Sequence, residues 1–270
     1  MADRPLTLMA VHAHPDDEAT STGGVLAKYA DEGITTVLVT CTNGELGDSG
    51  AIKPGEDGHN IEDVVRLRTS ELEASAKVLG ITHLEMLGYH DSGMMGWPQN
   101  DLPGAFWSVP VEEAAAKLAG LIDKYQPDVV VTYDDNGFYG HPDHIQAHRI
   151  TIAALDATRS RAKLYFPTIR RSGLGQFRER LGELGAELPE IDESEFGSPD
   201  ELIAAEVDCT DYSQQKFDSL AAHASQAENI FFLKLPLPVF QEMMGREAFI
   251  RERPARTDES VEDDLFAGLR

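Results

Sequence analysis

The stretch Leu6-Thr-Leu-Met-Ala-Val-His-Ala-His-Pro-Asp-Asp-Glu18 indicates the fold of this chain and the place of its chemistry. Its first part, 6–11, is an apolar run typical of a short buried strand. Its second part, 12–18, holds two histidines, a proline and three acids, and only Ala13 cannot bind a metal, move a proton or stiffen the backbone. An acidic turn after a strand can simply cap the next helix, but capping explains one or two acids. We therefore expect a functional site directly behind the first strand.

Strand-like and helix-like segments alternate from this point to about residue 166. The strand-like segments are 6–11, 35–40, 83–87, 129–132 and 163–166, and the helix-like segments between them cover about 20–33, 61–79, 111–125 and 144–156. This alternation predicts an α/β fold with a Rossmann-like, doubly wound and mostly parallel sheet. No Gly-x-Gly-x-x-Gly follows the first strand, which disfavours a nicotinamide cofactor and a dehydrogenase.

The chain divides into three expected regions. Residues 1–166 form a Rossmann-like, metal-binding catalytic core. Residues 167–256 form an elaborated C-terminal portion that completes the substrate pocket, either in the same domain or as a small subdomain. Residues 257–270 are acidic, and we expect a disordered tail there. The basic segment 159–180 and the acidic segment 183–208 form either a charged lid or, as charge runs usually do, surfaces that pair with each other.

Composition excludes several classes of partner. The formal charge is −24, from 47 acidic and 23 basic side chains, and such a surface repels nucleic acids and anionic lipids. Two cysteines make no disulfide framework, the N-terminus lacks the layout of a signal peptide, and the apolar runs are too short to span a bilayer. We expect a cytoplasmic protein with a small-molecule substrate, no nucleic-acid or membrane partner, and possible homo-oligomerisation.

The second motif, between Tyr133 and His144, follows the fourth strand. In the common doubly wound strand order, strands one and four are neighbours, and ligands bind beyond their carboxyl ends. The two motifs should therefore face each other, and together they supply His12, His14, Asp16, Asp17, His141, Asp143 and His144.

These side chains are of the types that a hydrolytic metal site needs. Two imidazoles and one carboxylate are a standard catalytic zinc set, and zinc lowers the pKa of bound water to about 7. A carboxylate that is not a ligand can then act as general base, and a histidine or tyrosine can stabilise the oxyanion. The constellation is suited to the hydrolysis of an amide or ester.

Four motifs resemble those of the LmbE/PIG-L family of zinc-dependent N-deacetylases, over about residues 7–160. They are His14-Pro-Asp-Asp-Glu18, Thr40-x-Thr-x-Gly-Glu45, Arg68-x-x-Glu71 with Leu79-Gly80, and Gly140-His-Pro-Asp-His144. Within that family the chain is most similar to the mycothiol-pathway branch, with its N-acetylglucosaminyl-inositol deacetylases and mycothiol conjugate amidases. Tyr133-Asp-x-Asn-Gly137 and Asp91-Ser-Gly-Met94 favour the deacetylase, whereas Ala222-His-Ala-Ser-Gln226 resembles a pattern in both.

The resemblance implies a role for each candidate residue. The implied metal ligands, for one Zn²⁺ per chain with Fe²⁺ as the alternative, are His14, Asp17 and His144. The implied catalytic residues are Asp16 as general base, His141 as general acid or oxyanion partner, Tyr139 polarising the carbonyl, and Asp143 orienting His141 or the metal. The implied substrate-binding residues are Arg68, Asp91, Glu45, Asn43 and His223.

The implied reaction removes an N-acetyl group from an N-acetylglucosamine-type conjugate and releases acetate, with zinc-bound water as nucleophile and Asp16 as its base. The alternatives are a mycothiol S-conjugate amidase or another amide hydrolase of the family and, from a different class, a non-catalytic metal-binding protein. Asp16 argues against the last, because storage needs no base. For Arg68 the alternative is an ion pair with Glu71 or Glu45. A supporting role is expected for His12, and a supporting or exposed one for His148.

Overall fold

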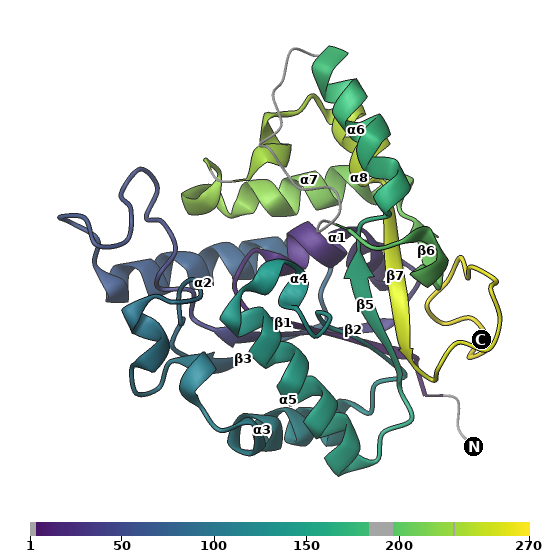
Figure 1. Ribbon diagram of the computed structural model, residues 1–270, viewed down its shortest axis with the longest axis horizontal. Coiled ribbons are helices and arrows are strands. Elements are labelled where there is room, and N and C mark those ends of the chain that lie inside the picture. The colour runs from purple at the N-terminus through teal and green to yellow at the C-terminus, as the bar shows by residue number, and fades with distance from the viewer. Residues whose placement is uncertain (1–3, 184–196, 229) are drawn as a thin grey trace.

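The computed structural model describes residues 4–183, 197–228 and 230–270 (Figure 1). Seven strands form a single sheet in the order β3-β2-β1-β4-β5-β7-β6. The strands are β1 (Thr7–His12), β2 (Thr35–Thr42), β3 (His83–Tyr89), β4 (Val129–Val131), β5 (Lys163–Thr168), β6 (Ala205–Asp208) and β7 (Arg246–Arg253). The first five pair in parallel, and β7 runs antiparallel to both of its neighbours, β5 and β6, so the predicted mostly parallel α/β sheet is confirmed.

Helices cover both faces of this sheet (Figure 1). They are α1 (Asp17–Asp31), α2 (Ile61–Val78), α3 (Val111–Tyr125), α4 (Gly137–Gly140), α5 (Pro142–Thr158), α6 (Arg171–Glu183), α7 (Ser213–Ala222) and α8 (Leu237–Met244). Side chains of α3 and α5 pack on one face, and those of α1 and α2 pack on the other. Helix α7 lies against α1 and α2 as an outer layer. None of the helices in the described part of the chain is long and apolar enough to cross a membrane.

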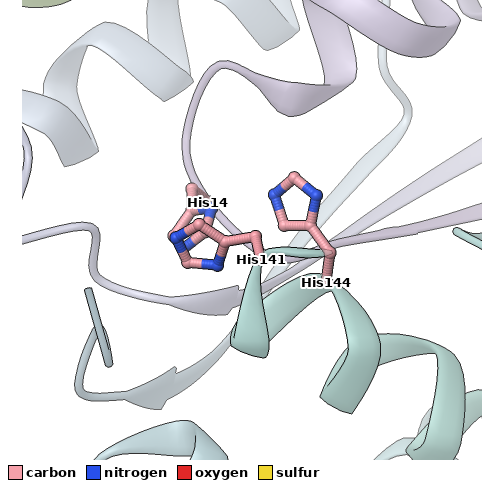
Figure 2. Close-up of side chains that lie close together, drawn as sticks. All are labelled: His14, His141 and His144. Atoms are coloured by element: carbon pink, nitrogen blue, oxygen red, sulfur yellow. The ribbon is translucent and has the colours of Figure 1, made fainter. Parts of the chain in front are cut away.

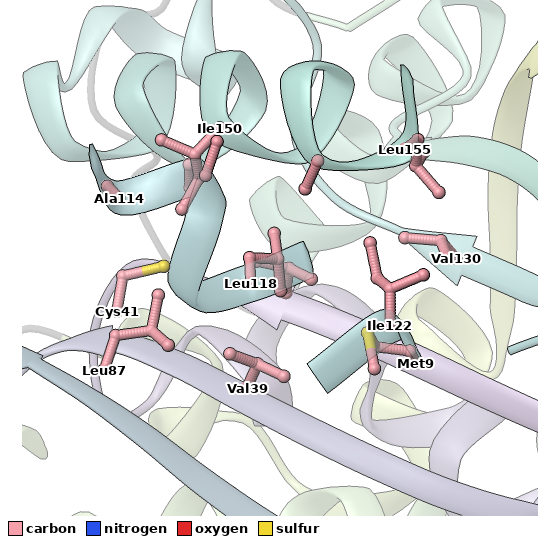
Figure 3. Close-up of a cluster of buried hydrophobic side chains, with 14 of the residues drawn as sticks. Met9, Val39, Cys41, Leu87, Ala114, Leu118, Ile122, Val130, Ile150 and Leu155 are labelled. Atoms are coloured by element: carbon pink, nitrogen blue, oxygen red, sulfur yellow. The ribbon is translucent and has the colours of Figure 1, made fainter. Parts of the chain in front are cut away.

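The apolar spacing of the helices explains this layering. In α3, Ala114, Leu118 and Ile122 repeat every four residues, which places them on one helical face. That face packs on Met9 and Val39 of the sheet, together with apolar residues of α5 (Figure 3). The central strands β1 and β4 are buried from both sides, and they accordingly consist of nearly continuous apolar runs rather than alternating patterns.

The neighbouring position of β1 and β4 determines where the site forms. Ala10 of β1 lies opposite Val131 of β4, so the carboxyl ends of the two strands meet at one edge of the sheet. The turn after β1 and the loop after β4 are therefore adjacent, although more than a hundred residues separate them in sequence. The predicted juxtaposition of the two motifs is confirmed.

The C-terminal portion adds strands to the same sheet. β7 pairs with β5, and β6 pairs with β7. Three residues of β7, Ala248, Phe249 and Ile250, are apolar. Its buried acid Glu247 lies 2.6 Å from the ammonium of Lys216 on α7. Charged residues recur along Arg246–Arg253, so its sequence gives little apolar signal for a strand. Its charged side chains form ion pairs instead, for example between Arg251 and Glu262 at 2.8 Å.

The last residues differ from the disorder expected from their acidic composition. Leu265 and Phe266 are fully buried against the core that includes Tyr29. The hydroxyl of Tyr29 donates to Asp264 at 2.9 Å and accepts from the backbone N–H of Leu265 at 2.8 Å. Two adjacent apolar residues anchor the segment together with the backbone hydrogen bonds of Glu262 to Ala204 and Glu206, and an average over the composition of the segment conceals both.

The two oppositely charged segments meet in part. Arg170 of the basic segment lies 3.0 Å from Asp200 and 2.9 Å from Glu206 of the acidic one. These contacts agree with pairing at the surface. Residues 184–196 of the acidic segment lie outside the described residues.

Candidate metal and catalytic site

The site forms where two helices begin at the edge of the sheet. Asp16 is the residue before the first turn of α1, and His141 has the same position before α5. Pro142 occupies the first helical position of α5, where its fixed φ and missing N–H are tolerated. The backbone N–H of Asp143 donates to Nδ1 of His141 at 3.1 Å, which closes this helix end. Figure 2 shows His14, His141 and His144 gathered at this edge.

The three predicted metal ligands lie together, with both histidines next to the carboxylate of Asp17. Nδ1 of His14 is 3.3 Å from Oδ2 of Asp17, and Nε2 of His144 is 3.5 Å from Oδ1. Nδ1 of His144 donates to the carbonyl of Gly137 at 3.2 Å, so its Nε2 carries the free lone pair. That atom is buried and has no hydrogen-bond partner among the described residues. Burial also lowers the pKa of His144 to about 4, which keeps the ring neutral as a ligand must be.

The donor set thus fits a divalent metal, and it can be completed in more than one way. The ligand atoms of His14, His141 and His144 lie within 4.8 Å of one another, as do those of His14, Asp91 and Asp143. The predicted set and the three-histidine set share His14 and His144. They differ only in whether Asp17 or His141 is the third ligand.

Asp143 contacts a different histidine from the one expected. Its carboxylate is fully buried and lies 3.2 Å from Nε2 of His14, while it accepts the backbone N–H of Ser92 at 2.9 Å. Only its backbone contacts His141. A carboxylate behind an imidazole fixes the tautomer and orientation of the ring and leaves Nδ1 of His14 for a metal.

Tyr133 is a site residue to which sequence reasoning gave no role. Its hydroxyl donates to Oδ2 of Asp17 at 2.7 Å and accepts from the backbone N–H of Ala13 at 3.0 Å. Its ring stacks on His144, with centroids 4.1 Å apart and an interplanar angle of 16°. One residue therefore orients two candidate ligands. The sequence signal that could have indicated this role is its position in the loop directly after β4, one residue beyond Thr132.

The two histidines expected in supporting roles contact Tyr133. His12 is fully buried, and its ring nitrogens lie 3.3 Å from the Tyr133 hydroxyl and 2.8 Å from the Thr22 hydroxyl. His148 lies on α5 with Nδ1 2.9 Å from the carbonyl of Tyr133. Neither belongs to a set of potential metal ligands in the described part of the chain.

Asp16 has the environment of a base. Burial and the adjacent charge of Asp17 raise its pKa to about 6, against the opposing effect of Arg68. Its Oδ2 accepts from the guanidinium of Arg68 at 3.0 Å. A carboxyl with a pKa this close to neutrality can accept a proton and release it again near pH 7.

His141 and Tyr139 stand beside the ligands. Because Nδ1 of His141 accepts a hydrogen bond, the proton of its neutral ring lies on Nε2, which is then a donor. Burial and the neighbouring His14 lower the pKa of His141 to about 3, so the neutral form prevails. The ring of Tyr139 lies 5.1 Å from that of His144 and is 53% exposed, at the open side of the site.

The predicted substrate-binding residues divide into two groups. The first group lies in the loops after β2 and β3 and consists of Asp91, Glu45 and Asn43. Asp91 accepts a hydrogen bond from the backbone N–H of Gly93 at 2.8 Å, and Oε1 of Glu45 lies 2.5 Å from Nδ1 of His90. One carboxylate oxygen of Glu45 is buried without a partner among the described residues, whereas the side chain of Asn43 is partly exposed.

The other two, Arg68 and His223, are buried away from solvent. Arg68 donates to the carbonyls of Gly44, at 2.6 Å, and Pro15 and to Asp16, rather than pairing with Glu71 or Glu45. His223 is 0% exposed, which differs from the pocket-lining role expected for it, because it turns inward to Glu18.

Comparisons with known proteins agree with this arrangement. The family model described as "PIG-L: GlcNAc-PI de-N-acetylase" matches residues 9–155. A relative from Geodermatophilus obscurus, named 1D-myo-inositol 2-acetamido-2-deoxy-alpha-D-glucopyranoside deacetylase, is 40% identical over 97% of both chains. A relative of the same name from Acidothermus cellulolyticus is 40% identical over 97% of this chain and 95% of its own.

Solved structures share the fold at low sequence identity. The N,N'-diacetylchitobiose deacetylase of Pyrococcus horikoshii matches with a TM-score of 0.59 and 22% identity, over 91% of this chain and 83% of its own. The 4-carboxy-2-hydroxymuconate hydratase GalB, from a Pseudomonas, matches with a TM-score of 0.63 and 15% identity, over 94% and 98%. The fold therefore accommodates more than one reaction, and the chemistry has to be argued from the site.

Proposed function

Because the chain belongs to the PIG-L family of de-N-acetylases, we propose that it hydrolyses the N-acetyl group of 1D-myo-inositol 2-acetamido-2-deoxy-alpha-D-glucopyranoside and releases acetate. Relatives of that name match nearly the whole length of this chain, including the C-terminal portion beyond the family model. The proposal therefore draws on both parts of the chain.

We propose zinc as the metal and His14, Asp17 and His144 as its ligands, with His141 left free for the substrate. The lone pair of His144 Nε2 has no partner among the described residues, and His14 presents Nδ1 toward Asp17. When bound, the metal supplies a Lewis acid and makes water available as a nucleophile near neutral pH. The acid Asp143 holds the His14 ring in place from behind.

Asp16 is the proposed general base. It neighbours the ligand Asp17 in sequence, and its raised pKa suits proton uptake near neutrality. Arg68 holds its Oδ2, which fixes the direction of the carboxylate. The proton accepted from water is then available for the departing amine, which balances hydrolysis into acetate and a free amino sugar.

His141 and Tyr139 are the proposed donors to the acetyl oxygen. The Nε2–H of His141 can donate a hydrogen bond to the negative charge that develops there. Partial desolvation of its hydroxyl within the site and the neighbouring Asp17 and Asp16 raise the pKa of Tyr139, so its phenol keeps its proton and can donate as well. We propose Asp91, Glu45 and Asn43 as contacts for the sugar hydroxyls.

The observation that carries this proposal is the position of Asp16. Its carboxylate lies beside the proposed metal ligands but is not itself needed to hold the metal. The test is an acetate-release assay on the inositol conjugate, on free N-acetylglucosamine and on a larger thiol conjugate with an amide bond, with metal content measured on the same sample. We expect acetate from the inositol conjugate at a kcat/KM at least tenfold above that for N-acetylglucosamine. Release of a larger acid from the thiol conjugate alone would instead identify the amidase.

A further inference from the structure

The backbone of Asp16 is unusual for a residue with a side chain. Its φ is 114° and its ψ is −25°, a region that favours glycine. A conformation of this kind costs about 1–3 kcal/mol and persists only where surrounding contacts enforce it. The contacts that enforce it therefore also determine where the Asp16 carboxylate points.

Two separate sets of contacts hold Asp16. On the side-chain side, Arg68 donates to its Oδ2 and also to the carbonyl of the preceding Pro15. On the backbone side, the N–H of Asp16 donates to Oε2 of Glu18 at 3.0 Å. Glu18 is fully buried, so its own position depends on what holds its other oxygen.

That other oxygen, Oε1 of Glu18, accepts hydrogen bonds from two donors, one in α2 and one directly after α7. The hydroxyl of Ser75 on α2 donates to it at 2.5 Å, and Nε2 of His223 donates to it at 2.8 Å. His223 directly follows the last residue of α7 and is 0% exposed. Its Nδ1 has no hydrogen-bond partner among the described residues. Within that part of the chain, the ring of His223 therefore makes its hydrogen bond to Glu18 alone.

We infer that His223 is a positioning residue for the general base: through Glu18 it fixes the strained backbone of Asp16 and thereby the direction of the Asp16 carboxylate. The inference rests on the function proposed above for Asp16. It gives His223, from a part of the chain outside residues 9–155, a role in turnover without contact with substrate. Small displacements of a catalytic group can cost about a hundredfold in rate, so the effect should be measurable.

The kinetic test compares His223→Leu and His223→Gln with the metal-loaded wild type. The leucine variant loses the donor to Glu18, and we expect kcat to fall about 10- to 100-fold with KM changed less than threefold. The glutamine variant keeps an N–H donor and should recover most of the lost turnover. Ser75→Ala, which removes the second donor, should lower kcat by about three- to tenfold, whereas Ser219→Ala removes an equally buried serine on α7 that does not contact Glu18 and should leave kcat unchanged.

A double-mutant cycle separates positioning from a general loss of structure. In an Asp16→Ala background, His223→Leu should lower the residual rate less than twofold, because the group that it positions is gone. If His223→Leu lowers the rate by the same factor with and without Asp16, the inference is wrong. Unchanged metal content across the variants is part of the expected result.

The final measurement does not depend on the substrate. Amide hydrogen exchange at Asp16, resolved by NMR or by fragmentation mass spectrometry, should become at least tenfold faster in His223→Leu, with β4 and α5 unaffected. It should remain near the wild-type rate in His223→Gln and Ser219→Ala. Unchanged exchange at Asp16 in His223→Leu would overturn the inference, whereas the absence of acetate release by the wild type would overturn only the proposed function.

Discussion

At the scale of single residues, Tyr133 connects the two halves of the site. Its hydroxyl bridges the backbone of Ala13 and the carboxylate of Asp17, and its ring lies flat on His144. Groups behind metal ligands fix the orientation of those ligands, and their loss typically lowers metal affinity about 10- to 100-fold. The site is therefore held together by a side chain that needs no contact with metal or substrate.

We predict that Tyr133→Phe weakens zinc binding about 10- to 100-fold while it keeps the stacked ring. The measurement is a chelator competition on metal-free protein. Tyr212→Phe is the matched control, because it removes a hydroxyl that donates to Asp31 at the surface at 2.9 Å. Equal zinc affinities in the Tyr133 variant and the wild type would contradict the role that we give to this hydroxyl.

The sequence could predict which residues gather at the site but not the contacts between them. The types and clustering of His14, Asp16 and Asp17 were sufficient to expect chemistry, and the strand order brought His141 and His144 to them. Which histidine Asp143 holds depends on side-chain rotamers, which spacing does not encode. The inward turn of His223 likewise depends on how α7 packs on α1.

At the scale of elements, helix α1 is fastened to the rest of the molecule at Gly24. The backbone N–H groups of Gly24 and Val25 donate to the carboxylate of Glu247 at 2.8 and 2.9 Å. A Cβ on Gly24 would lie 2.7 Å from Cβ of Cys209 and 2.8 Å from Oε1 of Glu247. Glycine is therefore needed here for close approach, in spite of its cost in a helix.

We predict that Gly24→Ala lowers the free energy of unfolding by about 1–3 kcal/mol, because the added carbon displaces Cys209 and Glu247. Gly120→Ala is the control on α3, where a Cβ would meet nothing within 4 Å. That variant should gain about 0.5–1 kcal/mol from better helix propensity. Urea denaturation of both variants checks that the free energy of unfolding changes in opposite directions. A stabilised Gly24→Ala variant would show that Cys209 and Glu247 leave room for a side chain at Gly24.

The first five strands could be predicted because β1, β2, β4 and β5 contain apolar runs between turn signals, and the short segment of β3 follows a helix that ends at a glycine. β7 could not, because its residues Arg246–Arg253 look like solvated surface. Burial of Glu247 becomes tolerable only through Lys216 from α7, and that pairing is not visible before the fold is known.

At the scale of the whole molecule, the C-terminal residues close the core beneath α1. The ring of Phe266 meets that of Tyr29 with centroids 5.0 Å apart at 82°, an edge-to-face contact. We predict that Phe266→Ala costs about 3–5 kcal/mol of the free energy of unfolding. Leu269→Ala, at a position 42% exposed, should change it by less than about 0.5 kcal/mol. Thermal and urea unfolding measure both, and equal stabilities would mean that the C-terminal segment is not anchored.

The reactivity of the two cysteine thiols should measure global unfolding. Cys41 and Cys209 are buried, and burial raises the pKa of each thiol. Because only the thiolate reacts, a raised pKa lowers the reactive fraction at any given pH, and burial blocks the reagent as well. We predict that a thiol reagent at pH 8 labels neither cysteine in the native protein and both together above the urea midpoint. Rapid labelling of one thiol without urea would contradict this.

β1 and β4 are neighbours in the sheet but far apart in sequence, so the ribosome synthesises the two halves of the metal site at different times. The proposed ligands are complete once His144 has emerged, whereas His223 has still to be synthesised. A growing chain can thus capture its metal before it holds the base in a working direction. Metal loading can help the early strands to pair, and on the inference above full turnover follows only when the part of the chain that carries His223 docks.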